Sequence, residues 1–273
     1  MINDFNEKTS LITGGTKGIG LSIALAFASQ GAKCVLTYKW DDENIEKVRQ
    51  SFHTLGYKEP LIVQANVAEE KDNLKLLELI KNQQNRPEEK IDIFVSNVAF
   101  GLLTKSFDDY SERGLLKSIE YSAWPMVSLT KLIKQNLGDY PKYVLGLSSN
   151  GPDAYHPNYD FVACSKALLE TMVRYLNYRL KDDDIIFNII RARFLKTESL
   201  RATFGEDFEK FGEKYNITDF FIETSEVANA ALALCSGMMD GVRGEVINID
   251  NGSTFSDNIM SYYENREKLG MWF

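Results

Sequence analysis

The chain has 273 residues, which fits one large α/β domain better than two ordinary domains. Hydrophobic residues make up 44% of it, and its 18 Gly and 6 Pro exclude a collagen-like or low-complexity chain. The formal net charge of −8 argues against nucleic acid or an anionic membrane surface as the main partner, because both bind basic proteins.

Cysteine and histidine are few and scattered. Cys34, Cys164 and Cys235 are an odd number and lie far apart, a pattern typical of reduced thiols in the cytoplasm. His53 and His156 are the only histidines, and no His/Cys cluster has metal-ligand spacing, so we expect no metal site. The sequence shows no signal-peptide pattern, and no apolar run approaches the roughly 20 residues of a membrane helix. We therefore expect a cytoplasmic protein.

Apolar periodicity predicts strands and helices in regular alternation. The expected strands cover residues 8–13, 33–38, 60–64, 91–97, 143–148, 185–191 and 245–250. The expected helices cover residues 18–30, 42–55, 69–85, 109–136, 165–180 and 224–236. Asp41 and Asp42 are plausible caps of the second helix. Pro125 marks a kink or boundary in the fourth, because proline lacks the backbone N–H that a helix interior needs.

This alternation predicts an α/β Rossmann fold, in which one domain over residues 1–273 contains a doubly wound parallel sheet of about seven strands. The nearly continuous apolar run 91–97 suits a strand that is covered by helices on both faces. Right-handed crossovers would place helices on both sides of such a sheet.

A glycine-rich turn, Thr-Gly-Gly-Thr-Lys-Gly-Ile-Gly at 13–20, joins the first expected strand to the first expected helix. Gly14 allows a tight turn, Gly18 allows the backbone to approach a pyrophosphate, and Gly20 allows close packing of helix on strand. The helix N-terminus adds N–H groups and partial positive charge for phosphates. We therefore predict a dinucleotide site. Its first cofactor-binding residues are Gly14, Thr16, Lys17, Gly18, Ile19 and Gly20.

The end of the second strand indicates which dinucleotide binds. An NAD site usually carries an acid about 20 residues after the glycine motif, to bind the ribose hydroxyls. Here Lys39 and Trp40 follow the strand, with no acid before Asp41. Lys17 and Lys39 would neutralise a 2′-phosphate, so the sequence favours NADPH over NADH. The alternative is that both lysines are ordinary surface charges.

Several motifs, in order, resemble the short-chain dehydrogenase/reductase family over nearly the whole chain. They are TGGTKGIG at 13–20, Asn-Val at 66–67, SNVAFG at 96–101, Ser-Lys-Ala at 165–167 and RGEVINIDNGS at 243–253. The resemblance implies a nicotinamide cofactor across the carboxyl edge of the sheet. It implies that Asn66 and Val67 lie near the adenine, Asn97 and Ala99 beside the adenosine ribose, Lys166 on the nicotinamide ribose, and Leu195 and Thr197 on the carboxamide.

The catalytic segment departs from most of that family. Val162 stands four residues before Lys166, where Tyr-x-x-x-Lys is usual, whereas Tyr159 gives Tyr-x6-Lys. That spacing is similar to the enoyl-acyl-carrier-protein reductases of the same superfamily, and the stretch 148–176 resembles their NADPH-dependent members. The resemblance makes Tyr159 and Lys166 the main catalytic candidates.

Other candidate donors lie nearby. Ser149 stands where ketoreductases carry their catalytic serine and where some enoyl reductases carry an extra tyrosine. Tyr155 is either a second proton donor or the true one. We interpret His156 as a surface residue of the loop. The asparagine usual in the fourth long helix is absent, and Tyr121 or Ser122 occupies that neighbourhood.

The chemistry fits the longer spacing. An enoyl reductase delivers hydride to the β-carbon of a conjugated thioester, so negative charge builds on the thioester oxygen, farther from the nicotinamide than a ketone oxygen. Tyr159 would stabilise that enolate, and the ammonium of Lys166 would lower the pKa of the phenol. We predict an NADPH-dependent enoyl-thioester reductase of fatty-acid or polyketide biosynthesis. The alternatives are a carbonyl reductase and a non-catalytic NADP-binding protein.

The segment after the sixth strand points to the substrate. Ala192-Arg193 replaces the Pro-Gly turn of the family, and the stretch 191–201 is locally basic. Arg193, Lys196 or Arg201 either steers an acidic acyl carrier protein or forms a solvated charged face. Segment 198–222 corresponds to the substrate lid of the family. Its aromatic residues, which line an acyl channel or only pin short helices, are Phe204, Phe208, Phe211, Phe220 and Phe221.

The resemblance also implies a homodimer or homotetramer. Helices 109–136 and 165–180 resemble the pair that builds a four-helix dimer interface in this family. The apolar end 270–273 is expected to dock on its own or a neighbouring subunit. The residues that fit either that interface or plain intrachain packing are Leu168, Leu169, Met172, Val173 and Leu176.

Overall fold

A computed structural model describes residues 5–6, 8–40, 45–82, 90–197, 200–201, 205, 207–214, 221–267 and 270. Its seven-stranded sheet has the order β3-β2-β1-β4-β5-β6-β7, and all its strand pairs are parallel. The strands are β1 (Thr9–Ile12), β2 (Lys33–Tyr38), β3 (Leu61–Gln64), β4 (Ile93–Ser96), β5 (Tyr143–Ser148), β6 (Ile186–Ala192) and β7 (Val246–Ile249). The order reverses between β1 and β4, which creates the crevice where doubly wound folds bind ligands. The predicted α/β Rossmann sheet is confirmed.

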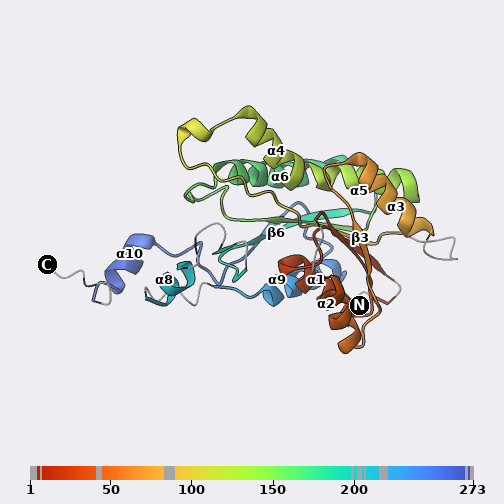
Figure 1. Cartoon of the computed structure of the whole chain (residues 1–273), viewed down its shortest axis with the longest axis horizontal. Helices are drawn as coiled ribbons and strands as arrows, with labels where there is room; N and C mark the ends of the chain where they lie inside the picture. The colour runs from red at the N-terminus through yellow and green to blue at the C-terminus, as the bar shows by residue number, and fades with distance from the viewer. Residues whose placement is uncertain are drawn as a thin grey trace.

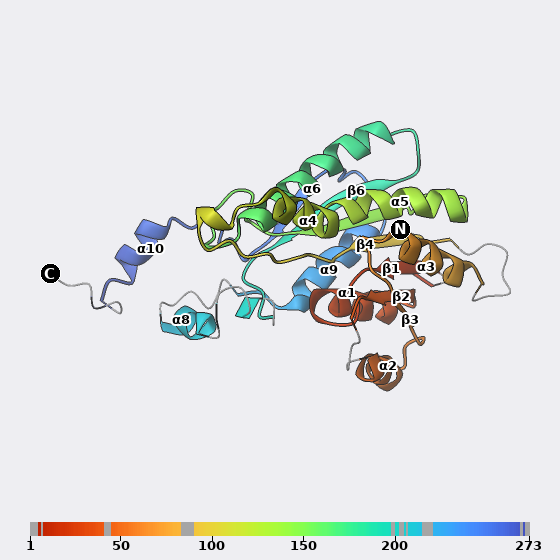
Figure 2. The same ribbon diagram turned by 45° about the horizontal axis from the view of Figure 1, so that its top comes forward.

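Helices cover both faces of this sheet, as Figure 1 shows with α3 to α6 on one side and α1, α2 and α9 on the other. The same two layers are visible in Figure 2, where α8 and α10 lie beyond one end of the sheet. The helices are α1 (Gly18–Ser29), α2 (Ile45–Thr54), α3 (Glu70–Asn82), α4 (Glu112–Ser122), α5 (Trp124–Leu137), α6 (Asp160–Arg179), α8 (Phe208–Lys214), α9 (Thr224–Cys235) and α10 (Asn258–Glu264).

Neighbouring residues of each inner strand point into different cores, because side chains alternate across a sheet. Ile12 packs in the core under α1 and α9, whereas Leu11 packs in the core under α3, α5 and α6. In β4, Val95 and Phe94 divide in the same way, and all four side chains have 0% exposure. Burying each such side chain contributes roughly 1.5–3 kcal/mol, so the apolar run 91–97 forms a central strand, as predicted.

Three boundaries differ from the sequence-based expectation. The long helix 109–136 is two helices, and Pro125 lies in the first turn of α5, where a missing N–H costs nothing. α6 begins at Asp160, five residues before the expected start, so that Tyr159 is its N-cap residue. α10 was not predicted from the sequence.

Part of the surface expected at a subunit interface belongs to the core of the chain itself. Leu169 and Val173 have 0% exposure and pack in the cluster under α5 and α6. Of the two alternatives given for these residues, packing within the chain is therefore the one that the structure shows. On the same helix Tyr175 and Tyr178 are exposed. The expectations for residues 41–42, Phe204, Phe220 and 271–273 lie outside the described residues. Within the described ranges, no helix is long and apolar enough to cross a membrane.

Candidate active site at the carboxyl edge of the sheet

The glycine-rich turn has the shape that a phosphate-binding loop requires. Gly14 and Gly18 have φ angles of 62° and 54°, in the left-handed region where a side chain is strained. A Cβ atom on Gly20 would lie 2.4 Å from the carbonyl oxygen of Gly14, so only glycine fits there. A Cβ atom on Gly18 would meet no atom within 4 Å. The backbone at Gly18 is therefore open to a ligand at the start of α1. Gly20, in contrast, packs directly against the backbone of Gly14.

Asn97, at the end of β4, holds this turn in place. Its Nδ2 donates to the carbonyl oxygens of Thr13 and Gly14 at 3.0 and 3.1 Å, and its backbone N–H donates to Thr13 Oγ1 at 3.0 Å. Ala99 lies exposed two residues further along. The strand that is expected to border the adenosine ribose is thus bonded directly to the expected phosphate loop.

Lys39 and Asn66, from the ends of β2 and β3, meet at the hydroxyl of Tyr121. Lys39 Nζ donates to Tyr121 Oη at 2.7 Å and lies 4.4 Å from the centroid of that ring. Asn66 Nδ2 donates to the same oxygen at 3.3 Å, and Val67 beside it is buried. Lys17 is exposed at the N-cap of α1. A half-buried cation therefore stands at the position expected to select the 2′-substituent of the adenosine ribose.

The hydroxyl groups of Tyr159 and Ser149 lie close enough to interact where β5 and α6 approach each other. Burial raises the pKa of Tyr159 above its ordinary value, and the interaction with Ser149 opposes that shift. The ring lies against the loop after β5, because a Cβ atom on Gly151 would come within 2.9 Å of the Tyr159 ring. The phenol is therefore a half-buried, neutral donor at the start of α6.

Asp160 ties the loop after β4 to the residue next to Tyr159. Its two carboxylate oxygens accept from Thr104 Oγ1 and from Tyr110 Oη, each at 2.5 Å. These two hydrogen bonds lower the pKa of Asp160. The N-terminus of α6 is thus fixed to the loop that leads from the cofactor side of the sheet.

Lys166 lies on α6 seven residues after Tyr159, about two helical turns and about 10 Å along the axis. Its ammonium is buried and donates to the carbonyl oxygen of Leu147 in β5 at 2.7 Å. Burial lowers the pKa of Lys166 to about 8, and the charge of Glu170 partly restores it. The expectation that Lys166 lowers the pKa of Tyr159 is wrong for this structure, because burial of the phenol dominates and raises that pKa.

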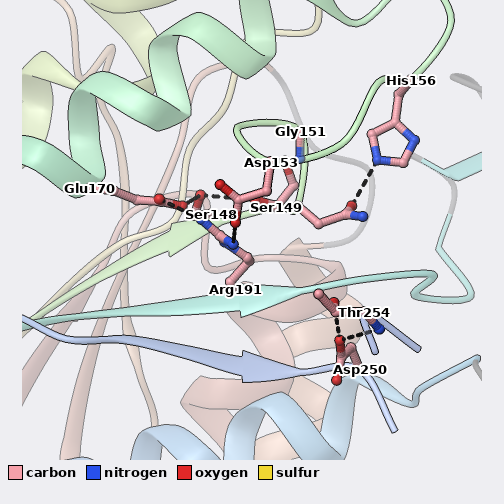
Figure 3. Close-up of polar contacts among 10 residues, drawn as sticks. Ser148, Ser149, Gly151, Asp153, His156, Glu170, Arg191, Asp250 and Thr254 are labelled. Carbon is pink, nitrogen blue, oxygen red and sulfur yellow. Dashed lines mark hydrogen bonds and ion pairs between the residues drawn. The ribbon is translucent and has the colours of Figure 1, made fainter. Parts of the chain in front are cut away.

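A buried ionic network connects α6 to β6 (Figure 3). Glu170 accepts from Arg191 Nε at 3.1 Å, from Arg191 Nη2 at 2.6 Å and from Ser148 Oγ at 2.6 Å. Arg191 Nη1 also pairs with Asp153 of the loop after β5. This network fixes the helix that carries Tyr159 and Lys166 to the ends of the two strands beside it.

Sequence reasoning missed this network, although two signals were present. Arg191 is the one charged residue of a fully buried strand, which predicts a buried partner. Glu170 follows Lys166 by four residues and therefore shares its helix face. Neither signal identifies the partner, because α6 and β6 meet only in the folded chain.

Tyr155 and His156 lie in the loop between β5 and α6, and their side chains have different surroundings. Tyr155 is 84% exposed, so its side chain points to solvent rather than into the site. His156 is half-buried, and its Nε2 lies 2.8 Å from Asn150 Oδ1 (Figure 3). His156 thus lies in the loop, as expected, but it is partly rather than fully exposed. Its ring meets the Tyr159 ring edge-on, with centroids 5.9 Å apart.

The expected carboxamide residues follow β6. Leu195 is buried and pairs with Ile222 in an isolated parallel bridge, and Thr197 Oγ1 accepts from the backbone N–H of Leu200 at 3.2 Å. Thr16 is buried and Ile19 is half-buried in the turn before and at the start of α1. Within the described ranges, no group of three or more His, Cys, Asp or Glu side chains could hold a metal ion.

The sequence matches a known family over most of its length. The family model described as "Enoyl-(Acyl carrier protein) reductase" matches residues 14–254. The enoyl-[acyl-carrier-protein] reductase [NADH] FabI of Enterococcus faecalis is 28% identical over 247 residues, covering 86% of this chain and 92% of that protein. The corresponding enzyme of Aquifex aeolicus is 27% identical over 274 residues, covering 96% and 95%.

Solved structures share the fold. The Bacillus cereus enoyl-acyl carrier protein reductase with NADP+ and indole naphthyridinone has a TM-score of 0.80 and 24% identity, covering 93% of this chain and 99% of that one. A 7 alpha-hydroxysteroid dehydrogenase complexed with NADH and 7-oxo glycochenodeoxycholic acid has a TM-score of 0.79 and 24% identity, covering 92% and 98%. The chain therefore belongs to the enoyl-(acyl carrier protein) reductase family, within the NAD(P)H-dependent oxidoreductases of the short-chain dehydrogenase/reductase superfamily.

Proposed function

We propose that this protein reduces the carbon–carbon double bond of an enoyl thioester, with Tyr159 as the residue that stabilises the enolate by donating a hydrogen bond to the thioester oxygen. The observation that carries the proposal is the half-buried Tyr159 at the N-cap of α6, beside Ser149, with Lys166 two turns further along the same helix. The Tyr-x6-Lys spacing and the match to the enoyl reductase family support the same reaction.

The residues present fit a nicotinamide dinucleotide. Gly18 leaves open space at the helix N-terminus, Asn97 fixes the turn beside it, and Lys39 stands at the end of β2. Lys166 would hold the nicotinamide ribose, while Leu195 and Thr197 would hold the carboxamide. When bound, the reduced nicotinamide supplies the hydride that the β-carbon receives.

Tyr159 would act on the thioester oxygen, at the end of the conjugated system opposite the β-carbon. Negative charge develops on the thioester oxygen during reduction, and a phenol aimed at that oxygen stabilises the charge by donating a hydrogen bond. Because burial raises its pKa, the phenol stays protonated at neutral pH and remains a donor. Ser149 orients the phenol, and Asp160 fixes the helix start that carries it.

We further propose NADPH as the preferred cofactor, since Lys39 offers a cation and no acid precedes residue 41 on that strand end. The relatives named above are NADH enzymes, whereas the Bacillus cereus structure contains NADP+, so the choice rests on Lys39. The proposed substrate is an acyl thioester on an acyl carrier protein, and the proposed setting is cytoplasmic fatty-acid or polyketide synthesis by a homodimer or homotetramer.

Ser149 favours a second candidate function. A serine beside the catalytic tyrosine is also the arrangement that a ketoreductase uses to polarise a carbonyl, so reduction of a ketone is the alternative reaction. A third possibility, cofactor binding without catalysis, follows from Val162 at the usual tyrosine position.

One assay distinguishes the three functions. Oxidation of NADPH and NADH is followed with crotonyl and acetoacetyl thioesters of coenzyme A and of acyl carrier protein. Turnover of the crotonyl thioesters supports the proposal. Turnover of only the acetoacetyl thioesters contradicts it in favour of the ketoreductase, and cofactor binding without any turnover supports the non-catalytic protein.

A further inference from the structure

The loop between β5 and α6 is closed by a hydrogen bond between the side chains of His156 and Asn150. Asn150 is only 6% exposed, and its Oδ1 lies 2.8 Å from His156 Nε2 (Figure 3). Because an amide oxygen can only accept, Nε2 carries the donated proton. The carbonyl oxygen of Asn150 also accepts from the backbone N–H groups of Asp153 and Ala154, each at 3.0 Å. Asn150 is therefore fixed in a turn, and its side chain holds the ring of a residue six positions further along.

His156 contacts Tyr159 through both its backbone and its ring. The carbonyl oxygen of His156 accepts from the backbone N–H of Tyr159 at 3.2 Å. The two rings have centroids 5.9 Å apart and planes at 81°, the T-shaped arrangement that aromatic rings favour. The imidazole that Asn150 holds is thus a direct neighbour of the phenol.

The first part of the same loop also touches the Tyr159 ring. A Cβ atom on Gly151 would lie 2.9 Å from Cδ1 and 3.0 Å from Cε1 of that ring, closer than side chains approach one another. The phenol therefore packs on the backbone next to Asn150 and against the imidazole bonded to Asn150. Packing of this kind leaves a side chain little room to turn.

A hydrogen-bond donor stabilises developing charge well only when it is already aimed at the charged atom. A misplacement of about 1 Å can cost about 10²-fold in rate. We infer that His156 is a positioning residue, which Asn150 holds against the Tyr159 ring so that the phenol keeps one orientation. The inference rests on the proposed function, in which the Tyr159 hydroxyl stabilises the enolate. It requires no contact of His156 with substrate or cofactor, so the effect of His156 on turnover passes through that hydroxyl.

A double-mutant cycle between His156 and Tyr159 separates this role from simple support of the loop. The value of kcat is measured with NADPH and a crotonyl thioester for the wild type, His156→Phe, Tyr159→Phe and the double variant. His156→Phe keeps a ring beside Tyr159 but removes Nε2, and with it the hydrogen bond to Asn150. Asn150→Ala removes the same bond from the other side and enters a second cycle with Tyr159→Phe.

We expect His156→Phe and Asn150→Ala each to lower kcat by about tenfold or more and to leave the Kd of NADPH near the wild-type value. Neither change should lower kcat further once Tyr159→Phe has removed the hydroxyl. His53→Phe is the matched control, because His53 is the other histidine of the chain and is exposed on α2, and it should change neither quantity.

Two kinetic results would overturn the inference. An equal fractional loss of kcat with and without the Tyr159 hydroxyl would show that His156 only supports the loop. An unchanged kcat in both His156→Phe and Asn150→Ala would show that the pair does not position the phenol. If His156→Phe does not fold, His156→Gln takes its place in the cycle, since its amide nitrogen can still donate to Asn150 while the ring contact is lost, and the same loss of kcat is expected.

Nuclear magnetic resonance tests the positioning without turnover. Tyrosine labelled with ¹³C at Cζ reports the 13 tyrosines, and the signal lost in Tyr159→Phe is that of Tyr159. Asn150→Ala leaves both rings intact, so it should shift or broaden the Tyr159 signal, whereas His53→Phe should leave it in place. An unchanged Tyr159 signal in Asn150→Ala would overturn the inference whether or not the enzyme is active. Absence of crotonyl reduction by the wild type would contradict the proposed function, while a shifted signal would still support the positioning of Tyr159 by the Asn150–His156 pair.

Discussion

The carboxylate of Glu170 binds both Nε and Nη2 of Arg191, and the two side chains are only 7% and 8% exposed. This pair joins the middle of α6 to the end of β6. Because α6 also carries Tyr159 at its start and Lys166 one turn before Glu170, the pair sets how the catalytic helix lies against the sheet. Ser148 Oγ donates to the same carboxylate, so β5 is also connected to α6 through Glu170.

Breaking this pair should destabilise the protein strongly. Glu170→Gln leaves a buried guanidinium without its main counter-charge and should lower the free energy of unfolding by about 3–5 kcal/mol, measured by urea denaturation. The double variant Glu170→Leu/Arg191→Met should lose less than the sum of the two single changes, since it removes both charges. Asp139→Asn, which breaks the exposed pair with Lys134, is the control and should cost at most about 1 kcal/mol. A loss of that small size for Glu170→Gln would show that the pair does not hold α6.

Tyr159→Phe should lower kcat by about 10²–10³-fold, because it removes only the hydroxyl that stabilises charge on the thioester oxygen. Cofactor affinity should stay near the wild-type value, since the ring and the helix remain. Steady-state kinetics and NADPH fluorescence titration measure the two quantities. Tyr155→Phe is the control and should leave kcat unchanged, because that side chain is 84% exposed. If Tyr155→Phe instead abolishes turnover, the assignment of the donor is wrong.

Lys166 should make stability depend on alkaline pH. Its pKa is about 8 in the folded protein and near the ordinary 10.5 when unfolded. Between these values the unfolded chain binds the additional proton, so the free energy of unfolding rises with pH across that window, by at most about 3 kcal/mol. Lys166→Met should remove this rise. Urea denaturation of both proteins from about pH 8 to about pH 10.5 measures the difference, and parallel pH curves would contradict the lowered pKa.

Gly18→Ala and Gly56→Ala form a matched pair, because both glycines have positive φ angles, 54° and 71°, and neither added Cβ would meet an atom within 4 Å. Each change should therefore lower the free energy of unfolding by a similar amount, roughly 1–2 kcal/mol, because of backbone strain. Only Gly18→Ala should weaken NADPH binding, because only Gly18 lies where the phosphates approach. Equal cofactor affinities in the two variants would remove Gly18 from the site.

Lys39→Gln should reduce the preference for NADPH over NADH by about tenfold or more in kcat/KM, because it removes the cation that faces the 2′-phosphate. Activity with NADH should change little. Lys131→Gln, an exposed lysine of α5, is the control for general charge effects. A wild-type enzyme that prefers NADH, or a Lys39→Gln variant with unaltered preference, would contradict the proposed role of Lys39.

The sequence by itself determined the sheet and its ligand edge. Apolar runs such as 91–97 and the glycine turn at 13–20 depend on local periodicity and local backbone freedom, so a parallel sheet of about seven strands and the glycine turn after its first strand could be predicted. The Tyr-x6-Lys spacing likewise indicated that Tyr159 and Lys166 lie close in the chain, and the structure has both on one helix and its N-cap; their catalytic roles stay a prediction.

Only the tertiary structure decided which side chains meet. Arg191 and Glu170 are 21 residues apart, and Lys39 and Tyr121 are 82 apart, so their bonds follow from how α6, β6, β2 and α4 pack. The raised pKa of Tyr159 and the lowered pKa of Lys166 also come from burial, which the folded chain creates and sequence spacing does not contain.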